Sequence, residues 1–102
     1  IPLAASHTAV AYPYPVIYAC SANLTLTLPL ASTQRDAYEA TIEYAQNVDV
    51  VIDVTTNTVT LNGQSGDITL RGSSEVGVVR ACRLKPAATG EDYRNPNATT
   101  AY

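Results

Sequence analysis

The chain has 102 residues, which is enough for one domain built around one hydrophobic core. Hydrophobic residues make up 46% of it and charged residues 15%, which is not the composition of a disordered chain. The formal net charge of -3 excludes a basic surface for a nucleic-acid backbone, and no apolar run is long enough to span a membrane. The only histidine is His7, which excludes multi-histidine metal sites, so we expect neither a metal nor a cofactor.

The first 15 residues are rich in Ala and Pro and end in Tyr12-Pro13-Tyr14-Pro15. Prolines fix φ and remove ladder donors, so this stretch is interpreted as an extended N-terminal arm rather than as part of the sheet. A first strand is predicted over residues 16–20. Residues 22–28 alternate Leu with Asn or Thr, which is typical of a half-buried strand.

Residues 32–45 are ambiguous, because Ser32 is a suitable helix cap while the positions that follow alternate in polarity. We expect a short helical turn near 33–36 and then a strand over 38–46. Alternation indicates further strands over 48–55, 58–61, 67–71 and 75–84. Asn62-Gly63 predicts a tight turn, since both residues tolerate positive φ. From residue 86 onward the chain is polar and unpatterned, and we interpret it as a C-terminal arm.

Together these elements predict an all-β domain over residues 16–85, flanked by extended arms over 1–15 and 86–102. Seven to eight short antiparallel strands at this spacing are typical of a sandwich or jelly roll. Phe, Trp and Met are absent and all seven aromatic residues are Tyr. The predicted inward-facing core residues are Leu24, Leu26, Leu28, Ile42, Val50, Ile52, Val54, Leu61, Ile68 and Leu70.

The two cysteines, Cys20 and Cys82, leave two readings open. In a secreted chain they could form a disulfide, whereas in a reducing compartment they would be small buried hydrophobic residues. Asn23 and Asn97 stand in Asn-X-Thr sequons, which matter only in a glycosylated, secreted chain. No arrangement of residues predicts a catalytic site, because neighbouring acids such as Asp49 and Asp53 are typical of a solvated strand face.

The order of strands and turns resembles small β modules of virion structural proteins in tailed bacteriophages. The resemblance covers about residues 22–72 and rests on the order of strands and turns. A Thr/Leu strand ends in Leu28-Pro29 and is followed by the small-residue linker Ala31-Ser32-Thr33. A Tyr-containing strand from Tyr38 to Asn47 precedes a Val-Ile strand over Val50–Val54, and the Leu61-Asn62-Gly63 turn precedes the Ile68-Thr69-Leu70 strand. It implies a non-enzymatic structural role: a decoration (cement) protein on the outer surface of a capsid, or a piece of a fibre.

Such a protein would bind the major capsid protein or another shell protein, and it would form a trimer or dimer. The arms are expected to make these contacts, since an ordered arm needs contacts beyond its own domain. The candidate interface residues are Tyr12, Tyr14, Tyr93, Tyr102 and Arg80. The competing hypothesis is an extracellular adhesive or filament subunit with a Cys20–Cys82 disulfide and an arm that donates a strand to a neighbour.

Overall fold

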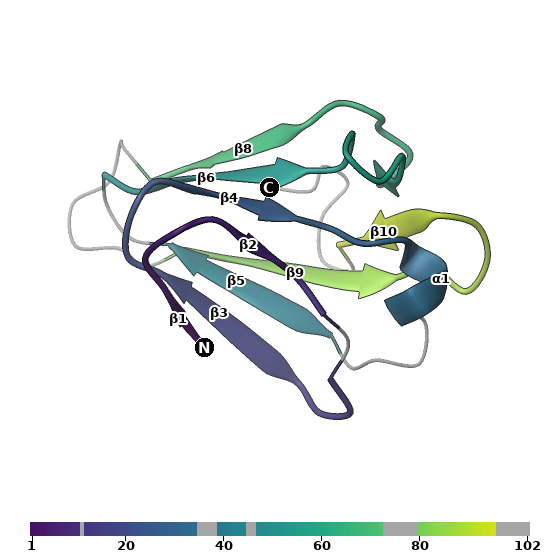
Figure 1. Ribbon diagram of the computed structural model, residues 1–102, viewed down its shortest axis with the longest axis horizontal. Coiled ribbons are helices and arrows are strands. Elements are labelled where there is room, and N and C mark those ends of the chain that lie inside the picture. Colours follow the sequence, from purple (N-terminus) through teal and green to yellow (C-terminus); the bar gives the residue numbers. More distant parts are fainter. Residues whose placement is uncertain (11, 35–38, 45–46, 73–79, 96–102) are drawn as a thin grey trace.

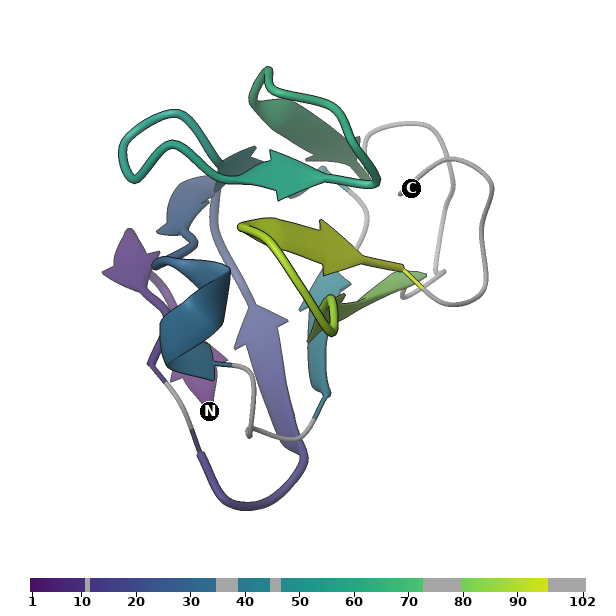
Figure 2. The same cartoon turned by 90° about the vertical axis from the view of Figure 1, so that its right-hand side faces the viewer.

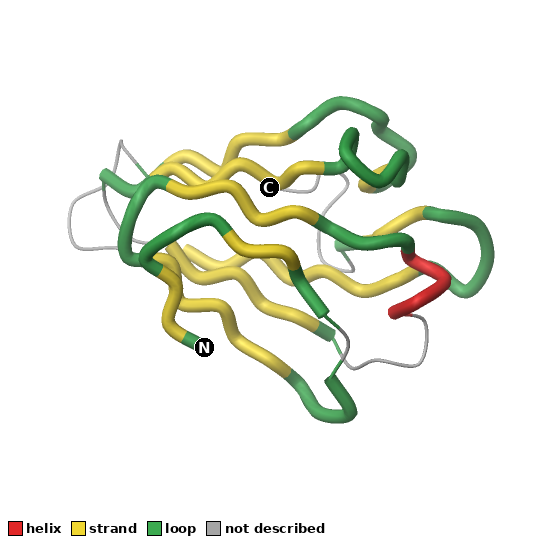
Figure 3. Tube along the Cα trace, in the orientation of Figure 1, coloured by secondary structure: helices red, strands yellow, loops and turns green. Residues whose placement is uncertain are grey.

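A computed structural model describes residues 1–10, 12–34, 39–44, 47–72 and 80–95 of the chain. The described residues are mostly β, as expected, with one four-residue helix (Figure 3). In chain order the elements are β1 (Pro2–Leu3), β2 (His7–Thr8), β3 (Val16–Cys20), β4 (Leu24–Thr27), α1 (Ala31–Gln34), β5 (Ala40–Tyr44), β6 (Asp49–Asp53), β7 (Thr60–Leu61), β8 (Ile68–Arg71), β9 (Arg80–Pro86) and β10 (Asp92–Arg94).

The strands form two mixed sheets, one in the order β1-β3-β5-β9-β10-β7 and the other in the order β2-β4-β6-β8. Figure 1 shows β4, β6 and β8 in one layer and β3, β5 and β9 in the other. Figure 2 shows α1 and β10 together at the end of the molecule that lies on the right in Figure 1. From β1 to β6, each strand lies in the opposite sheet from the strand before it. From β3 onward each therefore pairs with the strand two strands earlier, and these four pairs are parallel.

The expectation of a wholly antiparallel arrangement is therefore wrong. Antiparallel pairing is limited to β6 with β8, β5 with β9 and β9 with β10 among the described residues. The physical reason is that alternating polarity shows which face of a strand is buried. It carries no information about the direction of the neighbouring strand.

The predicted core is confirmed, because all ten residues expected to face inward are buried. Val50, Ile52 and Val54 are fully buried in or just after β6, and Leu26 is 1% exposed in β4. Both sheets contribute to one continuous cluster of buried side chains. The Leu-Thr alternation of β4 explains its placement, since every Leu faces this cluster and every Thr faces outward.

The N-terminal arm is a correction to the sequence-based expectation, because part of it belongs to the sheets. β1 pairs with β3 and β2 pairs with β4, and both are edge strands. Pro2 is tolerated because an edge strand leaves one side of its backbone without a ladder partner. Pro13 and Pro15 lie between β2 and β3, outside any strand.

The C-terminal arm is also partly folded into the domain. β10 is antiparallel to β9 and parallel to β7, and it places Tyr93 in the core with 4% of its surface exposed. A single apolar side chain between Asp92 and Arg94 is too short a pattern to predict a strand. Residues 96–102 lie outside the described residues.

The turns agree with the residues that make them. Asn62 and Gly63 have φ of 49° and 79°, and the flanking Leu61 and Gln64 exchange backbone hydrogen bonds of 2.9 and 3.0 Å. The predicted tight turn is therefore confirmed. The helical turn begins earlier than expected, at Ala31, and residues 35–38 lie outside the described residues.

The loop after β6 is organised by a buried carboxylate. Asp53 is 8% exposed and accepts hydrogen bonds from the hydroxyls of Thr27, Thr55 and Thr56 and from the backbone N–H groups of Thr55 and Thr56. These donors, led by the Thr56 hydroxyl and only partly opposed by burial, lower the pKa of Asp53 to about 2. Thr27 belongs to β4, so this carboxylate also ties the loop to the neighbouring strand.

Candidate interaction surface

Charge is distributed unevenly along the chain. No Asp, Glu, Lys or Arg occurs before Arg35, so β1 to β4 and α1 carry no such side chain. We call residues 1–34 the uncharged third. Charged residues are depleted at the centres of protein interfaces. This absence of charge is visible in the sequence alone, whereas the predicted interface residues rest on the arms and on Tyr.

Exposed apolar side chains gather in the same part of the molecule. Among the described residues, five large hydrophobic side chains are exposed, and all five belong to the uncharged third: Ile1, Val10, Tyr14, Ile17 and Leu30. Tyr14 is the most exposed at 53%, and Val10 follows at 51%. Ile17 points away from the core because β3 alternates buried and exposed positions. Scattered exposed hydrophobics are ordinary, but their restriction to one third of the chain marks a candidate interaction surface.

Tyr12 and Tyr14 lie on the segment that joins β2 to β3. Their ring centroids are 5.5 Å apart and the rings are tilted by 41°. Pro13 stands between them, and an extended backbone brings residues two apart to the same side. Tyr12 is half-buried and packs against the core, whereas Tyr14 is mostly exposed. The pair therefore presents an aromatic surface at one end of the molecule.

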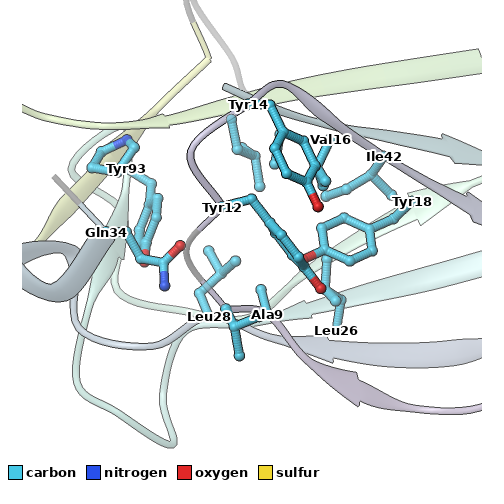
Figure 4. Close-up of a pocket in the computed structure, with 14 residues that line it drawn as sticks. Ala9, Tyr12, Tyr14, Val16, Tyr18, Leu26, Leu28, Gln34, Ile42 and Tyr93 are labelled. Carbon is cyan, nitrogen blue, oxygen red and sulfur yellow. The ribbon is translucent and has the colours of Figure 1, made fainter. Parts of the chain in front are cut away.

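Beneath this pair lies a small apolar cavity, which we call the tyrosine pocket. The space open to the centre of a water molecule is about 30 Å³, enough for about two waters. Figure 4 shows Tyr12, Tyr14 and Tyr18 gathered on one side of it and Gln34 and Tyr93 on the other. The lining also includes Ala9, Val10, Val16, Leu26, Leu28, Ala40, Ile42, Leu84 and Pro86. The cavity is too small and too apolar to hold a polar substrate.

Tyr18 forms the wall of the tyrosine pocket toward β2. It is 1% exposed, and its ring packs against the ring of His7 with centroids 5.6 Å apart. Burial raises the pKa of Tyr18, and a hydrogen bond with the backbone of Val10 opposes that effect in part. The hydrogen bond between Tyr18 and the backbone of Val10 fixes the start of the segment that carries Tyr12 and Tyr14.

The other predicted interface residues are placed differently. Tyr93 is in the core and donates a 2.7 Å hydrogen bond to the carbonyl oxygen of Pro29, so its side chain cannot reach a neighbouring chain. Burial raises the pKa of Tyr93 well above its usual range. Arg80 begins β9 opposite Tyr44, and its side chain lies outside what the structure describes, as does all of Tyr102.

The cysteines are buried thiols without a disulfide. Cys20 is in β3 and Cys82 in β9, with β5 between them. Cys20 lies opposite Tyr44 and Cys82 opposite Ile42, so two strand spacings and a two-residue offset put their Cα atoms more than about 10 Å apart, beyond the roughly 7 Å that a disulfide allows. Burial raises the pKa of both thiols, that of Cys82 to about 11. This fold therefore fits the reading of Cys20 and Cys82 as small buried residues better than the disulfide reading.

Metal-binding clusters and long apolar helices are both absent from the described residues. No three His, Cys, Asp or Glu side chains converge where they could hold a metal ion. No helix there is long and apolar enough to cross a membrane. Comparison with protein-family models, curated proteins and solved structures finds no match for this chain.

Proposed function

We propose that this chain is a non-enzymatic virion structural protein, a decoration (cement) protein that binds the outer surface of a capsid. Its partner would be the major capsid protein or another shell protein. The observation that carries the proposal is the uncharged third, with its exposed Val10, Tyr14 and Ile17. An uncharged surface with exposed apolar and aromatic side chains suits permanent contact between proteins. The resemblance of residues 22–72 to virion modules supplies the class of partner.

The proposal includes a β-sandwich architecture. Support comes from the alternation of β1 to β6 between two sheets and from the single buried cluster to which both sheets contribute. A jelly roll is built from antiparallel neighbours, whereas β1 to β6 pair in parallel. We therefore favour a sandwich with mixed sheets over a jelly roll.

The competing hypothesis of a secreted adhesive or filament subunit loses one of its two supports. The buried thiols of Cys20 and Cys82 are unbridged. The other support, a strand donated to a neighbour, is equally compatible with a decoration protein that forms a dimer or trimer.

The test is cosedimentation with shells assembled from the major capsid protein of the virus whose genome encodes this chain. We expect the purified protein to bind at a fixed ratio to the shell subunit and to raise the temperature at which the shells come apart. The double variant Tyr14→Ser, Ile17→Ser should lose most of this binding, because it removes two exposed apolar contacts.

The matched control is Lys85→Ser, which changes an exposed side chain on β9 within the charged part of the chain. This variant should bind as the unmodified protein does. Failure of the unmodified protein to sediment with the shells would overturn the decoration role. Equal loss of binding in the control and the double variant would overturn the assignment of the surface.

A further inference from the structure

We propose that the N-terminal segment, residues 1–10, exchanges between two copies of this chain. In the exchanged dimer, β1 and β2 of each copy pair with β3 and β4 of the other. The inference does not depend on the virion role, because it concerns the isolated chain.

The N-terminal segment is attached to its own domain by two short strands and few buried side chains. β1 and β2 contain two residues each and lie at the edges of different sheets. Only Leu3 and Ala9 are buried, and His7 is half-buried with its Nε2 atom lacking a hydrogen-bond partner. Releasing the segment therefore costs far less than releasing any central strand.

The hydrogen bonds that hold the segment in place can be made by either copy of the chain. They are main-chain bonds along the strand edges, such as Ser21 N–H to the Leu3 carbonyl and Ala9 N–H to the Thr27 carbonyl, both 3.0 Å. The Ser6 hydroxyl accepts a further bond from the Thr25 N–H. An identical segment from a second copy satisfies the same donors and acceptors, so exchange changes no native contact of the segment.

The connection between the segment and β3 contains Pro13 and Pro15, and both prolines are exposed. Their fixed φ favours an extended backbone over a tight return. A stiff, extended hinge resists the return that places β1 and β2 on their own domain, and this lowers the advantage of the closed form over the exchanged one. Domain swapping is a low-cost route to a dimer when a hinge permits it.

The exchange would also cover exposed apolar side chains beside the hinge. Val10 and Tyr14 flank the hinge and are each about half exposed. In an exchanged dimer the two hinges run side by side, and these apolar side chains then face each other. Exchange leaves the outer edges of β1 and β2 open, and neither strand carries a charged side chain. A second copy is therefore the occupant of the hinge, and the dimer would meet the proposed shell partner through exposed side chains outside the hinge, such as Ile17.

The register provides a direct test. Leu3 lies opposite Cys20 in the β1–β3 pair, and both side chains are buried on the same face. Adjacent strands lie about 5 Å apart, within disulfide range, so a cysteine at position 3 can bond to Cys20. The experiment uses Leu3→Cys in a Cys82→Ala background, oxidised at low and at high protein concentration. The products are separated without reductant, and the linkage is mapped by mass spectrometry.

We expect the 3–20 linkage in a covalent dimer of twice the chain mass, with its share rising as the concentration rises. The matched control, Ala4→Cys in the same background, places the new thiol on an exposed neighbouring residue and should give no link to the buried Cys20. A 3–20 linkage found only in the monomer band at every concentration would overturn the proposal.

A measurement on chains without new cysteines guards against a variant that fails to fold. The mass in solution of the unmodified chain, by light scattering during size exclusion, should be that of a dimer. The double variant Pro13→Ala, Pro15→Ala should shift toward monomer, because its hinge bends more easily. A monomeric unmodified chain, or a dimer unaffected by the hinge variant, would contradict exchange through this segment.

Discussion

The two sheets have edges of two kinds. At β1 and β2 the edge strands carry no charged side chain, and Ile1, Val10 and Ile17 are exposed nearby. At the far edge of the four-stranded sheet a charge is present, since Arg71 on β8 pairs with Asp49 at 3.7 Å. At the far edge of the other sheet β7 carries no charged side chain, and the nearest ion pair, Asp92 with Arg94 at 2.6 Å, belongs to its neighbour β10. The four-stranded sheet therefore has one charged edge, at β8, and one uncharged edge, at β2.

Charged side chains on an edge strand discourage pairing with another chain. A protein that was selected only to remain monomeric would be expected to protect all of its edges in this way. The difference between β8 and β2 therefore favours the β2 edge over the β8 edge as a place where another chain can pair. Substitutions in these strands and in the residues around them test this difference.

The largest expected effect is the difference in lost stability between a core substitution in β4 and an edge substitution in β1. Leu26→Ala, in the buried β4, should lower the free energy of unfolding by about 2–5 kcal/mol. Leu3→Ala, in the edge strand β1, should cost less than about 2 kcal/mol, because the edge can relax around the smaller side chain. Denaturant titration of both variants measures this. Equal losses would show that the N-terminal segment is a full part of the core.

The next effect belongs to Asp53, a carboxylate of the charged part that bonds to Thr27 in the uncharged third. Asp53→Asn should lower the free energy of unfolding by about 1–3 kcal/mol near neutral pH, because it removes a buried charge-assisted acceptor. The pKa of Asp53 is lowered from 3.8 to about 2 in the folded state. Its contribution is therefore present above pH 3.8 and is lost as the pH falls toward 2.

Denaturant titrations across this acidic range provide the measurement. The unmodified protein should lose more stability than Asp53→Asn as the pH falls. Parallel pH profiles for the two proteins would show that the hydrogen bonds of Asp53 contribute little to folding.

A smaller effect is expected at the turn that follows β7. Gly63→Ala forces a side chain onto a residue with φ of 79°, at a cost of about 1 kcal/mol. A Cβ at this position would meet no atom within 4 Å, so the cost is backbone strain rather than a clash. Gly66→Ala is the matched control, since its surroundings are equally open and its φ is not positive. Similar melting temperatures for the two variants would contradict the strain argument.

The smallest effect on stability is the most informative for the edges. Val10→Lys adds a charge beside the hinge and should change the free energy of unfolding by no more than about 0.5 kcal/mol. It should nevertheless reduce the dimer fraction, because two lysines would then face each other across the exchanged hinges. Thr69→Lys on β8 is the control and should leave the dimer unchanged. Light scattering distinguishes the two, and equal behaviour would remove the contrast between the edges.

Strands and core could be predicted from the sequence because the apolar residues of β4 and β6 alternate over several positions. The pattern in β1 and β10 has one buried residue each, Leu3 and Tyr93, which is too little to separate a strand from an arm. The parallel direction of β3 with β5 depends on which sheet each connection enters, and that is decided by packing. For the candidate surface, Tyr12 and Tyr14 were found from their composition, whereas the exposure of Val10 and Ile17 required the fold.

The alternation of β1 to β6 between two sheets has a kinetic consequence. No two of these strands that are consecutive in the chain pair with each other, so Val16 meets Ala40 and Leu24 meets Val50 only after a strand of the other sheet has been laid down. Local hairpins cannot nucleate this half of the molecule, and loop-closure entropy must be overcome before any ladder forms. High contact order of this kind slows folding to the millisecond-to-second range. A chain emerging from the ribosome therefore cannot complete the β3–β5 ladder until Tyr44 has emerged, and during that interval neighbouring nascent copies could exchange their first strands.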